Sequence, residues 1–216
     1  MKIAVLANGA WEPDWGKSVL NKVDFLICAD GGANHAFLSG RIPDLLIGDL
    51  DSISPANLKL CENYSGCVIQ QYPCEKDETD LELALIWAER QARQTEDQEI
   101  LLYGAAGKRM DHFLANIALM LAYARKGLRL RLVDLEHEMW IVQGRENIPG
   151  SKGQKLSLIV LSSSAVITTE GLYYSLQQET LFQDSPRGVS NVFLDNEAVV
   201  QVHEGWVLVV LPKIGE

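Results

Sequence analysis

The sequence is poor in cysteine, and none of its cysteines is spaced to bind a metal or to act as a redox pair. Four cysteines occur among 216 residues, none of them in a C-x-x-C pair, and no histidine stands at zinc-finger spacing. No apolar run is long enough to span a bilayer, and no secretory signal is visible before the first strand-like run. We therefore expect a cytoplasmic protein with no membrane partner.

Basic charge is also scarce. The sequence has 19 lysines and arginines against 29 aspartates and glutamates, which gives a net charge of -10. This balance argues against a nucleic-acid partner and against binding to an anionic membrane surface. It does not exclude a nucleotide, because a bound metal ion can supply positive charge locally.

The common glycine signatures of phosphate binding are absent. No G-x-G-x-x-G follows a strand-like run, and the G-x-x-x-x-G-K-[ST] spacing of the Walker A loop does not occur. A dinucleotide-binding fold or a P-loop of those types is therefore not supported.

The pattern of apolar residues predicts two domains. In residues 1–148, strand-like runs alternate with helical patterns, which predicts a parallel sheet covered on both faces, a three-layer α/β domain. In residues 149–216, only short strand-like runs occur between turn residues, which predicts a small all-β domain, a sandwich or barrel.

The expected strands of the first domain are 3–7, 24–29, 45–47, 67–70, 99–103, 128–133 and 139–142. Those of the second domain are 155–161, 165–169, 172–176, 190–194, 198–202 and 206–211. Helices are expected at about 34–38, 55–63, 80–88 and 113–125, and residues 11–16 are expected to form a loop.

Two carboxylates follow the third expected strand. The apolar run 45–47 leads into Gly48, Asp49, Leu50 and Asp51. Successive side chains of an extended strand alternate in direction, so Asp49 and Asp51 would point the same way. Two carboxylates at the end of a strand form an oxygen-rich site suited to Mg2+. The alternative is that Asp51 or the serine after it only caps the next helix.

Three other strands end in polar or glycine-bearing segments, at 30–34, 75–80 and 104–111. In open α/β sheets, ligands bind beyond the carboxyl ends of the strands, so these segments and residues 48–52 would meet at one edge. Their glycines allow close approach of the backbone to a ligand, and their acids and cations suit metal-bound phosphates.

Each segment also has a plainer interpretation when it is taken alone. Residues 30–34 can be an ordinary strand-to-helix turn. Asp77 and Asp111 can cap helices, and Lys108 and Arg109 can be solvated surface charges.

Together, the four segments resemble the thiamine pyrophosphokinase family. The matching stretches are Ala29-Asp30-Gly31-Gly32-Ala33-Asn34, Gly48-Asp49-Leu50-Asp51-Ser52, Asp77-Glu78-Thr79-Asp80-Leu81-Glu82-Leu83-Ala84-Leu85, and Gly104-Ala105-Ala106-Gly107-Lys108-Arg109-Met110-Asp111-His112 with Leu114-Ala115-Asn116. The second domain is similar to the family's thiamine-binding β domain through Gly171-Leu172-Tyr173-Tyr174-Ser175-Leu176 and Ser190-Asn191.

The resemblance implies an activity and its partners. The expected reaction moves the terminal pyrophosphoryl group of ATP onto the hydroxyl of thiamine, giving thiamine diphosphate and AMP, with Mg2+ required. The expected assembly is a homodimer with the thiamine site at the subunit interface.

The resemblance also implies roles for particular residues. The acids expected to hold Mg2+ or to orient the hydroxyl are Asp49, Asp51, Asp77 and Asp80, and Asp111 is expected to join them in catalysis. The residues expected to bind the nucleotide are Asp30, Gly31, Gly32, Asn34, Gly107, Lys108 and Arg109. Those expected to bind thiamine are Tyr174, Ser190 and Asn191, with strand packing as the alternative for Tyr174. The sequence leaves open which carboxylate, if any, takes the proton.

Three other functions compete with this one. The first is a related Mg2+-dependent diphosphokinase that acts on another alcohol, such as a hydroxymethyl-pterin. The second is a metal-dependent phosphatase with Asp49 as its nucleophile. The third is a nucleotide-binding module without catalysis, in which Asp51 could be changed without effect.

Overall fold

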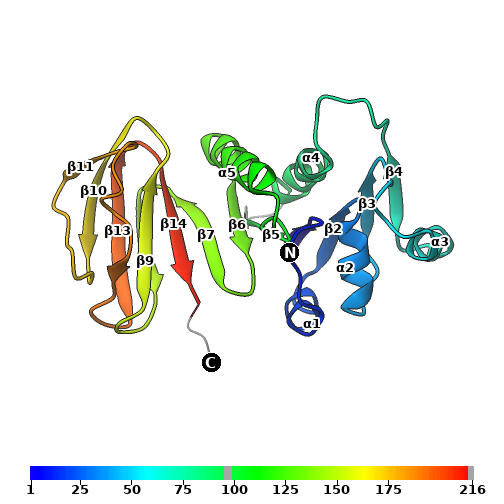
Figure 1. Cartoon of the computed structure of the whole chain (residues 1–216), viewed down its shortest axis with the longest axis horizontal. Coiled ribbons are helices and arrows are strands. Elements are labelled where there is room, and N and C mark those ends of the chain that lie inside the picture. Colours follow the sequence, from blue (N-terminus) through cyan, green and yellow to red (C-terminus); the bar gives the residue numbers. More distant parts are fainter. Residues whose placement is uncertain (95–98, 214–216) are drawn as a thin grey trace. The chain divides into compact units, whose positions relative to one another are not determined.

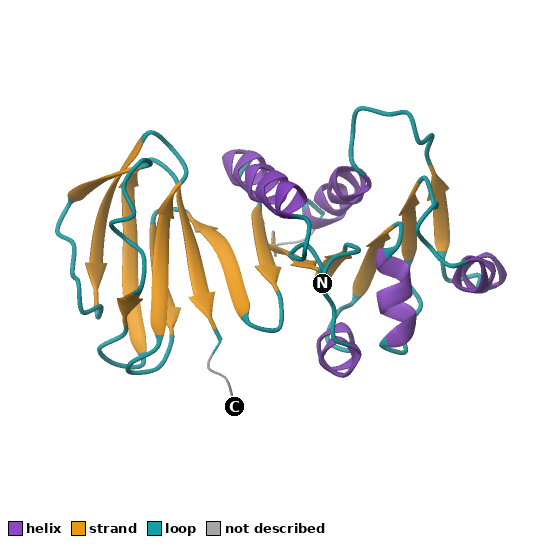
Figure 2. Ribbon diagram, in the orientation of Figure 1, coloured by secondary structure: helices purple, strands orange, loops and turns teal. Residues whose placement is uncertain are grey.

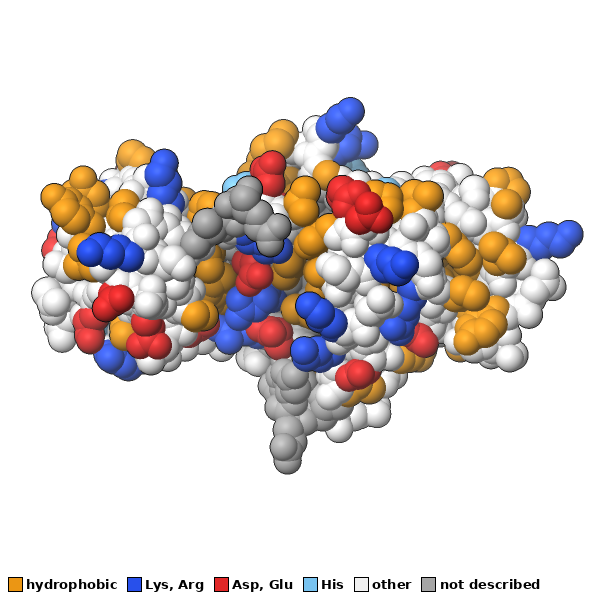
Figure 3. All heavy atoms as spheres, turned by 90° about the horizontal axis from the view of Figure 1, so that it is seen from below, with side chains coloured by type: hydrophobic (Ala, Val, Ile, Leu, Met, Phe, Trp, Pro, Cys, Tyr) orange, Lys and Arg blue, Asp and Glu red, His pale blue; other side chains and the backbone are white. Residues whose placement is uncertain are grey.

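The computed structural model describes residues 1–94 and 99–213. The chain divides into two compact units, Met1–Leu119 with Gly127–Leu135 and Met120–Lys126 with Glu136–Glu216. Among the residues that the structure describes, no helix combines the length and apolar character needed to cross a bilayer. On the face seen in Figure 3, acidic and basic side chains are interspersed with hydrophobic ones.

The first unit is built on a parallel sheet with the strand order β6-β5-β1-β2-β3-β4. The strands are β1 (Ile3–Leu6), β2 (Phe25–Ala29), β3 (Leu45–Gly48), β4 (Val68–Gln71), β5 (Glu99–Tyr103) and β6 (Arg129–Val133). Every residue of β1 and β3 is buried, as expected for strands covered on both faces. Strands β2, β3 and β4 follow one another on one side of β1, and β5 and β6 lie on its other side. The carboxyl ends of β1 and β5 therefore form the switch point at which such sheets bind ligands.

Helices cover both faces of this sheet, as Figure 1 shows for α4 on one face and for α1 and α2 on the other. The helices are α1 (Pro13–Leu20), α2 (Gly32–Leu38), α3 (Pro55–Asn63), α4 (Asp80–Ala92) and α5 (Met110–Arg125). Helix α4 contacts β1, β2, β3 and β5, and α2 contacts β1 and β2. The predicted three-layer α/β architecture is confirmed.

Helix α1 was not expected, because residues 11–16 were predicted to form a loop. Pro13 occupies the first turn, where its missing N–H costs no hydrogen bond. Glu12 caps the helix by accepting a hydrogen bond of 2.6 Å from the backbone N–H of Trp15. The buried Gly16 and Leu20 lie on its inner side. The prediction was wrong because glutamate is not among the residues that usually cap a helix.

The second unit consists of two antiparallel sheets, drawn as orange arrows in Figure 2. One has the order β12-β9-β14-β7 and the other β11-β10-β13-β8. Their buried faces share one core, which includes Trp140, Ile148, Phe193 and Val200. The strands are β7 (His137–Val142), β8 (Arg145–Pro149), β9 (Lys155–Val160), β10 (Ser164–Glu170), β11 (Glu179–Phe182), β12 (Asn191–Val192), β13 (Glu197–Glu204) and β14 (Val207–Pro212). The predicted small β domain is confirmed.

The second unit differs from the sequence prediction in three details. Strand β7 and most of β8 precede the expected boundary at residue 148, yet they pair with β14 and β13 of the second unit. Strands β8 and β11 were not predicted. The expected strand 172–176 is instead irregular chain with a single bridge from Leu172 to Phe193. Residues 172–176 were predicted to form a strand because they include apolar side chains. Two of these, Leu172 and Leu176, are indeed buried in the core, but irregular chain carries them there.

Candidate active site

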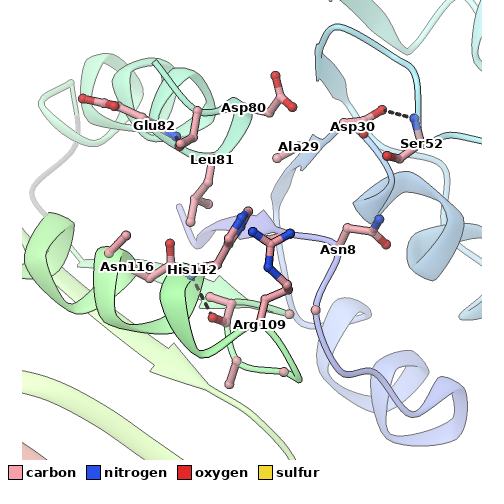
Figure 4. A pocket seen from close by; sticks show the side chains of 18 of the residues that line it. Asn8, Ala29, Asp30, Ser52, Asp80, Leu81, Glu82, Arg109, His112 and Asn116 are labelled. Carbon is pink, nitrogen blue, oxygen red and sulfur yellow. Dashed lines mark hydrogen bonds between the residues drawn. The ribbon is translucent and has the colours of Figure 1, made fainter. Parts of the chain in front are cut away.

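A cleft of about 1210 Å3 lies at the carboxyl ends of the parallel strands in the first unit. Loops after β1, β2, β3, β4 and β5, the first turn of α4 and the first three turns of α5 line it. Figure 4 shows Asp80, Asp30 and Ser52 on one side, with Arg109, His112 and Asn116 on the other. The volume exceeds the range of about 300–1,000 Å3 that is usual for small-molecule sites, so the cleft has room for a large ligand or for two.

Three carboxylates gather on the acidic side of the cleft. One oxygen from each of Asp30, Asp49 and Asp51 lies within 4.8 Å of the others. The backbone N–H of Ser52 donates to Oδ1 of Asp30 at 3.2 Å, and the backbone N–H of Asp51 donates to Oδ1 of Asp49 at 3.3 Å. These bonds hold like charges close together. The result is a set of hard oxygen donors of the kind that Mg2+ binds.

A turn, rather than strand alternation, brings Asp49 and Asp51 together. Strand β3 ends at Gly48, whose φ is 145°, and Leu50 has a φ of 66°. The predicted proximity of the two acids holds, but the extended backbone assumed for it is wrong. A Cβ atom on Gly48 would lie 3.0 Å from both Asp30 Cβ and Asp80 Cγ, so glycine is needed for the acids to approach.

Asp80 extends the acidic side from the start of α4, and a lysine lies beside it. Lys76 Nζ is 3.0 Å from Oδ1 of Asp80 and 3.7 Å from Oδ2 of Asp49. Although this ammonium is near, Oδ1 of Asp80 is buried and has no hydrogen bond of acceptable geometry to any described residue. The two groups are close enough for an ion pair, but we infer that their angle does not suit a hydrogen bond.

The surroundings shift the pKa values of the acids in opposite directions. Burial raises the pKa of Asp30, and the hydrogen bonds from Ser52 only partly oppose it. For Asp49, desolvation also raises the pKa, but hydrogen bonds from Asp51 and Cys74 and the charge of Lys76 outweigh it and lower the pKa below its ordinary value. Asp49 is thus held ionised, while the charge on Asp30 is disfavoured.

The glycine turn after β5 packs on the loop after β1. The N–H of Gly9 donates to the carbonyl of Gly104 at 2.7 Å, and that of Ala10 donates to Ala106 at 2.7 Å. A Cβ atom on Gly9 would lie 2.2 Å from the Gly104 oxygen. These glycines therefore serve the contact between the two loops, which brings Gly107 to the wall of the cleft.

Lys108, Arg109 and Asp111 also line the cleft, but Asp111 is not among the clustered carboxylates. Its carboxylate accepts two close hydrogen bonds from the Arg109 guanidinium, at 2.9 Å from Nε and 2.6 Å from Nη2. Both side chains are exposed. The hydrogen bonds from Arg109 hold the pKa of Asp111 well below its usual range.

Of the residues expected to bind the metal or the nucleotide, four do not line the cleft. Asp77 is exposed, and the helix cap proposed for it as an alternative is made by Thr79, which accepts from the N–H of Glu82 at 3.2 Å. Gly32 allows α2 to pack on β1, since a Cβ atom there would lie 2.1 Å from the Leu6 carbonyl oxygen, and a Cβ atom on Gly31 would lie 2.2 Å from Nδ2 of Asn8 in the loop after β1.

The fourth of these residues, Asn34, anchors the loop after β3. Its side chain donates to the Ser52 carbonyl at 3.0 Å and accepts from the N–H of Ser54 at 3.0 Å. It therefore supports the turn that carries Asp51 without reaching the cleft.

The residues expected to bind thiamine lie in the second unit. The amide of the buried Asn191 donates to the Tyr174 carbonyl at 2.8 Å and accepts from its N–H at 3.0 Å. The Tyr174 side chain is exposed and its ring meets that of Tyr173 edge-on at 4.9 Å. Ser190 has a φ of 60°, and its N–H donates to Ser157 Oγ at 3.0 Å. The amide of Asn191 thus holds the backbone that presents Tyr174.

Sequence reasoning assigned no role to several residues that line the cleft. Asn8 follows β1, and a polar residue after a strand-like run is a signal that could have found it. Ser52 lies in the segment 48–52 that was expected at this edge. Lys76 precedes the acidic stretch 77–80 and lines the cleft, but no role was predicted for it. His112 also lines the cleft.

The fold and the cleft define the class of the protein. A parallel sheet with clustered carboxylates, glycine turns and cations at its switch point is the arrangement of a metal-dependent enzyme that acts on nucleotide phosphates. The family model "Thiamin pyrophosphokinase, catalytic domain" matches residues 17–132, and "Thiamin pyrophosphokinase, vitamin B1 binding domain" matches residues 140–207. The chain belongs to the thiamin pyrophosphokinase family.

Individual relatives agree with this membership. Thiamine pyrophosphokinase of Bacillus subtilis is 27% identical over 187 residues, covering 85% of each chain. Thiamine pyrophosphokinase 1 of Oryza sativa is 28% identical over 209 residues, covering 83% of this chain and 76% of the relative. The crystal structure of the Bacillus subtilis protein superposes with a TM-score of 0.84 at 25% identity, covering 100% of both chains.

Proposed function

We propose that this protein transfers the pyrophosphoryl group of ATP to the hydroxyl of thiamine, with thiamine diphosphate and AMP as products. The observation that carries the proposal is the close group of Asp30, Asp49 and Asp51 inside the cleft of the family's catalytic domain. The relatives named above are thiamine pyrophosphokinases, which favours thiamine over a hydroxymethyl-pterin as the accepting alcohol.

Mg2+ fits the donors present. Asp30, Asp49 and Asp51 would hold it, and Asp80 would add its buried Oδ1, which accepts no hydrogen bond from the residues that the structure describes. This set replaces the expected one, because Asp30 enters it and Asp77 leaves it. When bound, the metal supplies positive charge that neutralises phosphate oxygens during transfer.

The side chains of the cleft would orient the two substrates. In the reaction, the thiamine oxygen forms a bond to the β-phosphorus of ATP, the bond from that phosphorus to the oxygen shared with the α-phosphate breaks, and AMP leaves. Lys108 and Arg109 face the cleft and would bind phosphate oxygens. A carboxylate of the cleft would orient the hydroxyl and take its proton.

Thiamine recognition is proposed for Tyr174 and Ser190, with Asn191 holding the backbone of Tyr174. A cationic thiazolium ring suits an exposed aromatic face. We also propose a homodimer with the thiamine site at the subunit interface, which rests on the family resemblance and is tested by the mass of the protein in solution. The four free thiols fit the proposed cytoplasmic location.

The reaction is tested with purified protein, ATP, Mg2+ and thiamine. We expect AMP and thiamine diphosphate in equal amounts, and no turnover once EDTA removes the metal. Release of ADP would identify a simple kinase, and a trapped aspartyl-phosphate on Asp49 would identify a phosphatase. Nucleotide binding without turnover would identify a binding module.

A further inference from the structure

Lys76 lies between two acids that come from different segments of the chain. Its Nζ atom is 3.0 Å from Oδ1 of Asp80, the first residue of α4, and 3.7 Å from Oδ2 of Asp49, which follows β3. The Lys76 side chain is only 11% exposed. The ammonium thus sits among the acids of the cleft and is shielded from bulk water.

The contacts of Lys76 with these acids are loose. Its hydrogen bond goes to the carbonyl of Pro73 at 3.1 Å, within its own loop. The 3.7 Å separation from Asp49 is too long for a hydrogen bond, and Oδ1 of Asp80 lacks one of acceptable geometry among the described residues. The attraction to both acids is therefore mainly Coulombic, and hydrogen-bond geometry does not fix the ammonium to either of them.

The charges around Lys76 are unbalanced. Asp30, Asp49, Asp51 and Asp80 line the same side of the cleft, and one ammonium lies among them. The other lysine and arginine found among the described lining residues, Lys108 and Arg109, belong to the turn after β5. Lys76 is therefore the basic side chain placed to respond when a cation enters the acid group.

We propose that Lys76 is an exchangeable counter-ion and a positioning residue for the transferred phosphates. In the empty cleft it neutralises Asp49 and Asp80, and when these acids bind a divalent cation it turns to a phosphate oxygen of the nucleotide. Lys76 would then oppose binding of the cation alone and favour binding of the nucleotide, which couples the two ligands. The identity of the nucleotide rests on the proposed function; the counter-ion role does not.

The test measures binding rather than turnover, with Lys76→Met as the main variant. Without nucleotide, we expect Lys76→Met to bind Mn2+ at least about tenfold more tightly than the wild type, because a repelling charge has been removed from a shielded site. At saturating Mn2+, we expect it to bind α,β-methylene-ATP at least about fivefold more weakly, because a cation that contacts phosphate has been lost. Isothermal titration calorimetry and the electron paramagnetic resonance signal of free Mn2+ give both constants.

Two further variants separate charge from structure. Lys76→Arg keeps the charge, and both affinities should stay within about threefold of the wild type. Lys59→Met removes the same charge from the exposed side of α3 and should move neither affinity. Lys76→Gln repeats the measurement with a polar side chain if the methionine variant unfolds at a lower temperature.

Opposite shifts of the two affinities in Lys76→Met would support the proposal. Unchanged or weaker Mn2+ binding would overturn it, and so would an unchanged affinity for the nucleotide analogue. If the wild type binds both ligands but releases no AMP in the presence of thiamine, the proposed function is wrong. The two affinities would still decide the role of Lys76.

Discussion

The backbone N–H of Ser52 donates a hydrogen bond of 3.2 Å to Oδ1 of the buried Asp30. This bond joins the loop after β3 to the end of β2 and fixes the distance between Asp30 and the acids at 49 and 51. Several consequences of this arrangement can be measured.

Asp30→Asn is expected to stabilise the metal-free protein. Burial raises the pKa of Asp30, so the folded state binds the proton more readily than the unfolded state. Stability therefore falls as the pH rises through the interval between the unfolded and the folded pKa, and it stays lower above that interval. At pH 7 the variant should unfold about 1–3 °C higher than the wild type, and the difference should shrink in acid.

Addition of Mg2+ should reverse this order. The wild type gains stability from the bound metal, whereas Asp30→Asn has lost one donor and should gain little. Differential scanning fluorimetry with and without Mg2+ measures both effects. Asp184→Asn, an exposed change in the second unit, is the control. A metal-free Asp30→Asn protein less stable than the wild type would contradict the view that burial disfavours the charge on this carboxylate.

Asp51→Asn should abolish most of the activity. The change keeps the shape of the side chain but removes a charge from the group that would hold Mg2+. We expect kcat/KM for AMP release to fall at least about a hundredfold. Glu78→Gln removes a charge from an exposed position outside the cleft and should change kcat/KM less than about threefold. Equal activity of Asp51→Asn and the wild type would favour a binding module.

Asp77 and Asp80 are expected to differ sharply, although they stand three residues apart. Asp80 lines the cleft beside Gly48, whereas Asp77 is exposed and lies outside the lining. Asp80→Asn should lower kcat at least about a hundredfold, and Asp77→Asn less than about tenfold. Steady-state kinetics of the two variants at saturating Mg2+ decide between the structure and the sequence-based assignment, which treated both acids alike.

The sequence indicated which acids follow strands because an apolar run that ends in a polar residue is a local signal. Apolar runs followed by Asp30, Asp49 and Asp51 indicate strands that end at a polar edge, and the parallel sheet brings those ends together. What it could not give is the direction of each side chain. Asp77 and Asp80 are the same residue type in the same acidic stretch. The helix begins after its cap at Thr79, so Asp80 lies in the first turn and Asp77 lies before the helix.

Glycines were the harder residues to interpret. Gly31 and Gly32 were predicted to bind the nucleotide, and the structure gives each a packing reason as well, against the Asn8 side chain and the Leu6 carbonyl of β1. A glycine needed for packing and a glycine needed for a ligand look the same in one sequence. The second unit was predicted less well for a related reason, because short apolar turns such as 172–176 have the composition of strands.

Gly48→Ala should disturb the acid group without touching any charge. A Cβ atom there would lie 3.0 Å from Asp30 Cβ and Asp80 Cγ, and the φ of 145° disfavours a side chain. We expect a loss of about 1–3 kcal/mol in the free energy of unfolding and at least about tenfold weaker Mn2+ binding. Gly153→Ala, at a positive φ of 87° in open space, carries the backbone cost alone and should leave Mn2+ binding unchanged. Equal Mn2+ affinities of the two variants would mean that Gly48 does not set the spacing of the acids.

Asn191→Ala tests whether this asparagine acts through Tyr174. Its buried amide exchanges two hydrogen bonds with the Tyr174 backbone, so truncation leaves buried polar groups without partners. We expect a loss of about 2–4 kcal/mol in the free energy of unfolding, measured in urea. The KM for thiamine should rise while the KM for ATP stays constant, because only the second unit carries the change. Asn196→Ala, at an exposed position, should alter neither. Tyr174→Ala should reproduce the rise in the KM for thiamine with little loss of stability, since its ring is exposed. If Asn191→Ala lost stability but bound thiamine normally, the asparagine would serve the β fold alone.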